Sequence, residues 1–196
     1  MAGAALVAGT EGLLWLLQSS GSLPGLQVVY RGHAGIVWSV AWSPDGQFVA
    51  STSGDNTVQV WQAANGKRVS VYSTSSVHAA AWSPNGRLIA FTNGGAVQGV
   101  QGWNPFSSNS GSQFSYAVDP EGTWSVAWSP DGERIAVGGH SGVEILNVAN
   151  GEVVFKHDWP YAEVTAVTWS PDGRYIAWGS SGYDLGLEFQ SGSVEV

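Results

Sequence analysis

Residues 40–46 of this chain read VAWSPDG, and residues 126–132 repeat the same seven letters. Two variants of this stretch, AAWSPNG at 80–86 and VTWSPDG at 167–173, complete a set of four. The tryptophans of the four copies are separated by 40, 46 and 41 residues; they are Trp42, Trp82, Trp128 and Trp169. A period of this length predicts one small β-sheet unit per repeat.

The first unit shows why each repeat should form four antiparallel strands. Apolar residues alternate in IVWSVAWSP (36–44), which indicates a strand with one buried face. The SPDG that ends it is a tight turn, because proline presets φ and glycine accepts a positive φ. QFVAST (47–52) and VQVWQ (58–62) are the next two strands. The Asn-Gly hairpin signal at 65–66 then leads into RVSVY (68–72), the fourth strand.

This unit resembles the WD40 repeat. Gly32-His33 stands for the Gly-His pair of that family and SGDNTVQVW (53–61) for its closing segment, although Gln62 replaces the final aspartate. The resemblance implies a hydrogen-bonded structural network in this blade, made by His33, Ser51 or Ser53, Asp55 and Trp61. The other repeats depart from this pattern, with Gly95 and Ser141 at the position of the aspartate.

The fold class that follows is all-β, a WD40-like β-propeller of four complete four-stranded blades. The blades are expected at about 36–73, 76–117, 122–157 and 163–196, after an N-terminal partial blade of three strands at 4–31. We expect the whole chain to form one propeller domain or a segment of one. The alternatives for closing the ring are that the chain is a piece of a larger propeller, that it closes with fewer blades, or that it needs a partner. Open blade edges favour self-association or a larger complex.

Composition excludes several classes of function. Fifteen acidic against seven basic residues give a net charge of −8, which disfavours nucleic acid as a partner. The chain has no cysteine, which excludes thiolate metal sites and cysteine nucleophiles. The apolar N-terminus lacks a basic region and contains Glu11, so we expect neither a signal peptide nor membrane insertion. The sequence does not determine the compartment, although it favours a soluble cytoplasmic location over export.

No catalytic motif is present. The four histidines have no spacing typical of a metal site, so we expect no metal and no cofactor. The aspartates of the PDG turns recur with the turn and fall on different blades. The glycine-rich stretch at 94–102 lacks the Gly-Lys-Ser/Thr of a phosphate loop. These observations predict a protein that is not an enzyme.

The sequence predicts binding of a partner more strongly than it predicts catalysis. In WD40 proteins the top face presents residues from the start of each first strand, which here gives Ile36, Trp38, His78, Trp124, Glu163 and Thr165. Trp38 and Trp124 fall where the family has a β-bulge, and they are either exposed binding residues or packed between blades. Exposed tryptophans are frequent hot spots at interfaces. The four motif tryptophans are expected to be core residues instead.

We therefore expect a scaffold that binds a protein or peptide on its top face. A structural assembly subunit that pairs through open blade edges is the first alternative. A propeller that binds a sugar or another small molecule is the second, and among the top-face positions only His78 and Glu163 would serve it. The regular WSPDG copies resemble bacterial WD40 arrays more than eukaryotic ones.

Overall fold

The computed structural model describes residues 28–94, 99–108, 111–119, 122–158, 162–182 and 192–195. All the regular structure in these residues is antiparallel β-sheet, which confirms the all-β prediction. The first sheet contains β1 (Val37–Trp42), β2 (Phe48–Ser53), β3 (Thr57–Gln62) and β4 (Arg68–Ser73), and the second contains β5 (Ala80–Trp82), β6 (Ile89–Asn93), β7 (Gly99–Trp103) and β8 (Ser112–Ala117). The third contains β9 (Thr123–Trp128), β10 (Arg134–Gly139), β11 (Gly142–Asn147) and β12 (Val153–Asp158), and the fourth contains β13 (Ala162–Trp169), β14 (Tyr175–Gly182) and β15 (Gly192–Glu195).

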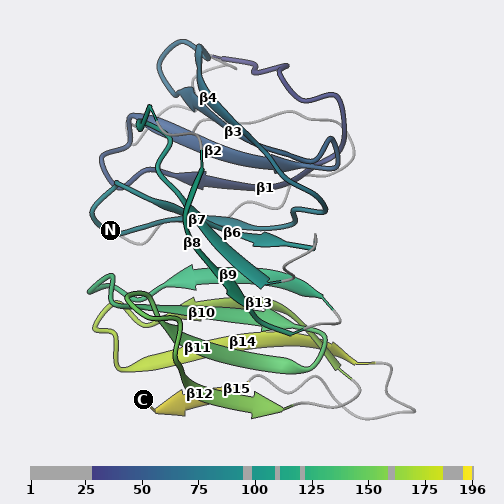
Figure 1. Cartoon of the computed structure of the whole chain (residues 1–196), viewed down its shortest axis with the longest axis vertical. Coiled ribbons are helices and arrows are strands. Elements are labelled where there is room, and N and C mark those ends of the chain that lie inside the picture. Colours follow the sequence, from purple (N-terminus) through teal and green to yellow (C-terminus); the bar gives the residue numbers. More distant parts are fainter. Residues whose placement is uncertain are drawn as a thin grey trace, which may run out of the picture.

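In each sheet the strands follow one another in chain order, so each sheet is one blade. The first strands of the blades contact one another in series, β1 with β5, β5 with β9 and β9 with β13. Figure 1 shows the first blade at one end of the molecule and the third and fourth blades at the other. The core lies between blades: for example, Val58 and Val60 of the first blade pack with Trp82, Phe91 and Trp103 of the second.

The repeated SPDG is a turn closed by its own side chains. Asp45 Oδ1 accepts hydrogen bonds from Ser43 Oγ at 2.5 Å and from the Gln47 amide at 3.0 Å. Gly46 adopts a φ of 70°, a backbone conformation that residues with a Cβ rarely adopt. The turn recurs because every blade needs a tight connection between its first and second strands.

The motif tryptophans join neighbouring blades. Trp82 Nε1 donates to the Ala41 carbonyl at 3.1 Å, Trp128 Nε1 donates to Ala81 at 3.1 Å, and Trp169 Nε1 donates to Ala127 at 3.2 Å. Trp82 and Trp169 are buried, as expected of core residues. Trp42 is different, since 44% of its surface is exposed. The core prediction is therefore wrong for Trp42, which belongs to the first described blade and has no earlier described blade to pack on.

Two expectations fall partly outside the described residues. The N-terminal partial blade at 4–31 is described only from residue 28, where Tyr30 stacks on Trp61 with ring centroids 5.2 Å apart. In the fourth blade, residues 183–191 are not described, and β15 pairs with β14 as the third strand of the sheet. The sequence predicts SVEV (193–196) one position further out, as the start of the fourth strand.

Candidate protein-binding face

The top face is the end of the blades at which the first strands begin. At this end the pairing of the first and second strands is interrupted by a bulge in three blades: between Val37 and Ser39, opposite Gly138 and Gly139, and between Val164 and Ala166. The residues that the bulges leave unpaired are Trp38, Trp124 and Thr165. A bulge re-aims a side chain relative to the regular alternation of a strand.

His78 occupies the same position in the second blade, two residues before the start of β5. Thr92 Oγ1 accepts hydrogen bonds from the His78 amide at 3.2 Å and from the Ala79 amide at 3.0 Å. The His78 carbonyl accepts a bond from Thr52 Oγ1 of the first blade at 2.8 Å. Threonine hydroxyls of two blades therefore fix the backbone that carries His78.

Trp38, His78 and Trp124 form a continuous aromatic row across three blades. The ring centroids of Trp38 and His78 are 6.0 Å apart, and those of His78 and Trp124 are 4.5 Å apart. Trp38 is 45% exposed, whereas Trp124 is half-buried and its Nε1 has no hydrogen-bond partner among the described residues. The aromatic row therefore presents apolar surface at Trp38, whereas the indole N–H of Trp124 is buried.

Burial lowers the pKa of His78, against the opposing effect of a hydrogen bond to the Thr123 backbone. A histidine whose pKa falls below its ordinary value of 6.5 is neutral at pH 7. The aromatic row is therefore uncharged under physiological conditions.

The remaining top-face candidates do not join the aromatic row. Ile36 is 54% exposed at the edge of the first blade, and Thr165 is exposed on the fourth blade. Glu163 pairs with His140, with Oε1 and Nδ1 3.5 Å apart. The fourth blade thus contributes a carboxylate, paired with His140 of the third blade, where the first three blades contribute aromatic rings.

The structure brings together His33, Ser51 and Asp55, which the WD40 resemblance assigns to a structural network. His33 Nδ1 lies 2.9 Å from Asp55 Oδ2, and its Nε2 lies 2.8 Å from Ser51 Oγ. Ser53 instead accepts a hydrogen bond from the Asp55 amide within the turn. Trp61 differs from the expectation, because its ring stacks on Tyr30 and its Nε1 has no hydrogen-bond partner among the described residues.

Sequence reasoning missed three members of this network. Thr57 Oγ1 donates to Asp55 Oδ1 at 2.6 Å, Gln59 Nε2 lies 3.0 Å from His33 Nδ1, and the Tyr30 hydroxyl donates to Gln59 Oε1 at 2.5 Å. Burial acts to raise the pKa of Asp55, but hydrogen bonds from Thr57, the Ala34 amide and His33 outweigh it and lower the pKa to about 2. The alternation in VQVWQ gave the one available signal, since Gln59 is a polar residue in the middle of a buried strand.

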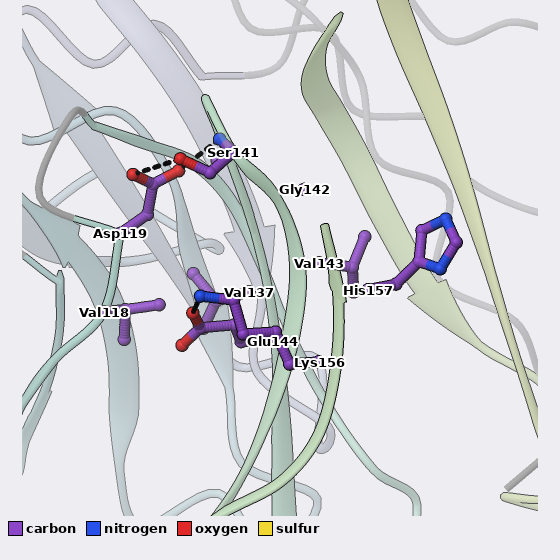
Figure 2. A pocket seen from close by; sticks show the side chains of 10 residues that line it. Val118, Asp119, Val137, Ser141, Gly142, Val143, Glu144, Lys156 and His157 are labelled. Atoms are coloured by element: carbon purple, nitrogen blue, oxygen red, sulfur yellow. Dashed lines mark hydrogen bonds and ion pairs between the residues drawn. The ribbon is translucent and has the colours of Figure 1, made fainter. Parts of the chain in front are cut away.

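The third blade closes the same loop differently. Asp119 stands at the position of His33 and Ser141 at that of Asp55, and Asp119 accepts hydrogen bonds from the Ser141 amide at 2.5 Å and from Ser141 Oγ at 3.0 Å. Figure 2 shows this pair on one side of a small cavity, with Glu144 and Lys156 nearby. The two latter residues form an ion pair with Oε1 and Nζ 3.1 Å apart.

The chemistry available in the described part of the chain is limited. The cavity of Figure 2 holds about 10 Å³, roughly the room of a single water molecule. No group of three or more histidine, aspartate or glutamate side chains converges in the described ranges. His78 and Glu163, on which a small-molecule site would depend, have separate partners. The same part of the chain contains no helix that is long and apolar enough to cross a membrane.

Blades of antiparallel strands in chain order, stacked through their first strands, define a β-propeller, and the comparisons with known proteins agree. Residues 25–62 match the family described as WD domain, G-beta repeat, and residues 50–185 match the family described as Eukaryotic translation initiation factor eIF2A. The first match confirms the predicted WD40 repeat, and the second covers more than half of the chain. The chain therefore belongs to the WD40-repeat family and to the eIF2A family.

Individual relatives match over a shorter range. A Ribosome biogenesis protein BOP1 homolog from Drosophila virilis is 42% identical over 50 residues, which is 26% of this chain and 6% of the relative. The homologs from Drosophila grimshawi and Drosophila ananassae are 40% identical over the same length, again 6% of each relative. These relatives are fly proteins, so they give no support to the expectation of a bacterial-type array.

Proposed function

We propose that this chain is a non-catalytic platform that binds a protein or peptide on its top face. The observation that carries the proposal is the aromatic row, in which three blades contribute touching rings at the position of the strand bulge. Trp38 forms its exposed end. Tryptophan side chains on a rigid scaffold supply large contact areas with little loss of conformational entropy, which favours their use as anchors.

The partner best suited to this face is a segment with an apolar or aromatic side chain. The row is uncharged, and Trp38 presents its exposed apolar ring to such a segment. A net charge of −8 and Glu163 at the border of the face favour basic residues beside that side chain. Nucleic acid is disfavoured as a partner for the same electrostatic reason.

The relatives support an interaction role and nothing finer. Their name places them in ribosome biogenesis, but the alignment covers one quarter of this chain. What we carry over is the use of the repeat as a surface for binding proteins.

The test starts from peptides selected by display of a random library on the full chain. The peptide with the highest affinity is then titrated against the Trp38→Ala/Trp124→Ala double variant by calorimetry. We expect its Kd to rise by at least about 30-fold, because a single interface hot spot contributes about 2 kcal/mol. The proposal fails if the double variant binds the selected peptides as tightly as the unaltered chain, or if the chain selects none.

Trp42→Ala is the matched control for this experiment. Trp42 is a tryptophan of the same strand, four residues from Trp38, and it is 44% exposed where Trp38 is 45% exposed. It lies outside the aromatic row, so its removal should leave the Kd of the selected peptide unchanged. A loss of affinity in this variant would point to an unspecific effect of removing exposed tryptophans.

A further inference from the structure

Each described junction between blades is built in the same way. The second strand of one blade presents an alanine to the following blade: Ala50, Ala90 and Ala136 all have an exposure of 0%. The following blade contributes its motif tryptophan, which donates to the carbonyl of the residue paired with that alanine. A small side chain beside a backbone acceptor therefore receives each tryptophan.

The fourth blade carries the same arrangement with nothing described on it. Ala177 pairs with Thr168 as Ala136 pairs with Ala127, but Ala177 is exposed. Tyr175 is the equivalent of Arg134, and it is 38% exposed. In the preceding junction Arg134 covers the Trp169 ring, with its guanidinium 4.8 Å from the ring centroid. We call Tyr175, Ala177, Gly179 and the Thr168 carbonyl the receiving face.

Two glycines at equivalent positions show the difference most clearly. Gly138 pairs with Ser125 in the third blade, and Gly179 pairs with Ala166 in the fourth. A Cβ on Gly138 would lie 2.6 Å from Val164 of the next blade, so only glycine allows the blades to approach this closely. A Cβ on Gly179 would meet nothing within 4 Å. The fourth blade therefore has the shape of a blade junction but no described neighbour.

The complementary half of such a junction lies at the other end of the same chain. Trp42 is the motif tryptophan of the first blade, and it is exposed, whereas Trp82 and Trp169 are buried and Trp128 is partly buried. In the three described junctions the indole N–H of the equivalent tryptophan donates to a carbonyl of the preceding blade.

We propose that the receiving face binds the first blade of a second copy of this chain, head to tail. Trp42 of one copy packs on Ala177 and Gly179 of the other, and its Nε1 donates to the Thr168 carbonyl. The interface continues the three junctions within the chain, which is the reason for choosing a second copy over an unrelated protein. A head-to-tail contact of this kind closes into a ring or extends as a chain of copies.

The test is the mass of the full chain in solution, measured by light scattering after size exclusion at about 10 and 100 µM. We expect a mass above the 20.5 kDa of one copy, rising with concentration. Ala177→Arg places a charge on the receiving face, and Gly179→Leu adds a side chain where the equivalent position allows none. Each should return the mass to that of one copy, with an unchanged far-UV circular dichroism spectrum.

Val154→Arg is the matched control, since Val154 is an apolar residue, 49% exposed, on the outer strand β12. It should associate like the unaltered chain. A mixture of Trp42→Ala and Ala177→Arg copies retains one intact interface between the two kinds of copy. The mixture should therefore form a species of about 41 kDa, twice 20.5 kDa, and nothing larger.

Three results would overturn the proposal. The first is a single-copy mass for the unaltered chain at both concentrations, and the second is an unchanged mass for both receiving-face variants. The third is association that survives Trp42→Ala. That result would assign the receiving face to a different occupant, and residues 1–27 of this chain or another propeller would then be the candidates.

Discussion

The first and third blades solve the same structural problem with the acid on opposite sides. In both, the loop before the first strand is tied to the turn between the second and third strands. In the first blade the carboxylate is in the turn, at Asp55, and binds His33 and the Ala34 amide of the loop. In the third blade the carboxylate is in the loop, at Asp119, and binds the amide and hydroxyl of Ser141 in the turn.

The fold therefore requires one acceptor and its donors across this gap and does not prescribe which side carries the acid. Both carboxylates are largely withdrawn from solvent, with 14% of the Asp55 side chain and 7% of the Asp119 residue exposed. A buried acceptor without donors is destabilising, so each acid must find donors on the opposite segment. A search for the His-Asp signature alone misses the third blade, because Asp119 and Ser141 stand there in place of the histidine and the aspartate.

The largest expected effect comes from putting an acid on both sides. Ser141→Asp gives the third blade the turn residue of the first, but places a second carboxylate against Asp119. We expect a loss of about 3 kcal/mol in the free energy of unfolding at pH 7, because two buried like charges cannot both be solvated. Urea denaturation measures it. The pKa of one carboxyl should rise in the folded state, so the loss should shrink as the pH is lowered to 5.

Asp119→Asn added to Ser141→Asp should recover more than half of that loss, because the amide supplies a donor opposite the new carboxylate. Asp119→Asn alone completes the double-mutant cycle. If Ser141→Asp is as stable as the unaltered chain, the two blades do not share one constraint, and the comparison between them is wrong.

A smaller effect is expected from Asp55→Asn in the first blade. The pKa of Asp55 falls from its ordinary 3.8 to about 2 on folding, which corresponds to about 2 kcal/mol of stability. Because the folded pKa is the lower one, this stability is present above pH 4 and is lost as the pH falls through 2. Asp55→Asn should therefore lower the free energy of unfolding by about 2 kcal/mol at pH 7.

The measurement is urea denaturation of Asp55→Asn and the unaltered chain from pH 7 down to the lowest pH at which both fold. Their difference should narrow below pH 4. Asp158→Asn serves as the control, since this side chain is 69% exposed and pairs with Lys156 at the surface, an interaction that contributes little. A difference that stays constant across the acid range would show that Asp55 acts through packing and not through its charge.

Much of this architecture follows from the sequence, and what does not follow has a common physical cause. The 40 to 46-residue period aligns Trp38, His78, Trp124 and Thr165 at one position of each blade. The sequence does not show that the rings of Trp38, His78 and Trp124 touch, because their contact depends on the angle between blades. The exposure of Trp42 has the same origin, since burial of a repeated residue is a property of the neighbouring blade. Local turns were predictable, whereas contacts between blades were not.

The smallest effect is expected where the first and third blades agree. Both use an aspartate in the SPDG turn, and the second blade has Asn85 there, which accepts the hydrogen bonds of Ser83 Oγ at 2.8 Å and the Arg87 amide at 3.0 Å. An amide oxygen therefore suffices, and Asp131→Asn should change the free energy of unfolding by less than about 0.5 kcal/mol. Asp131→Ala, which removes the acceptor, should be more destabilising than Asp131→Asn in the same urea titration. Equal losses of stability in the two variants would mean that the carboxylate charge, which Asn85 lacks, stabilises this turn. The position of the acid would then be free to vary only where the loop before the first strand is tied to the turn between the second and third strands.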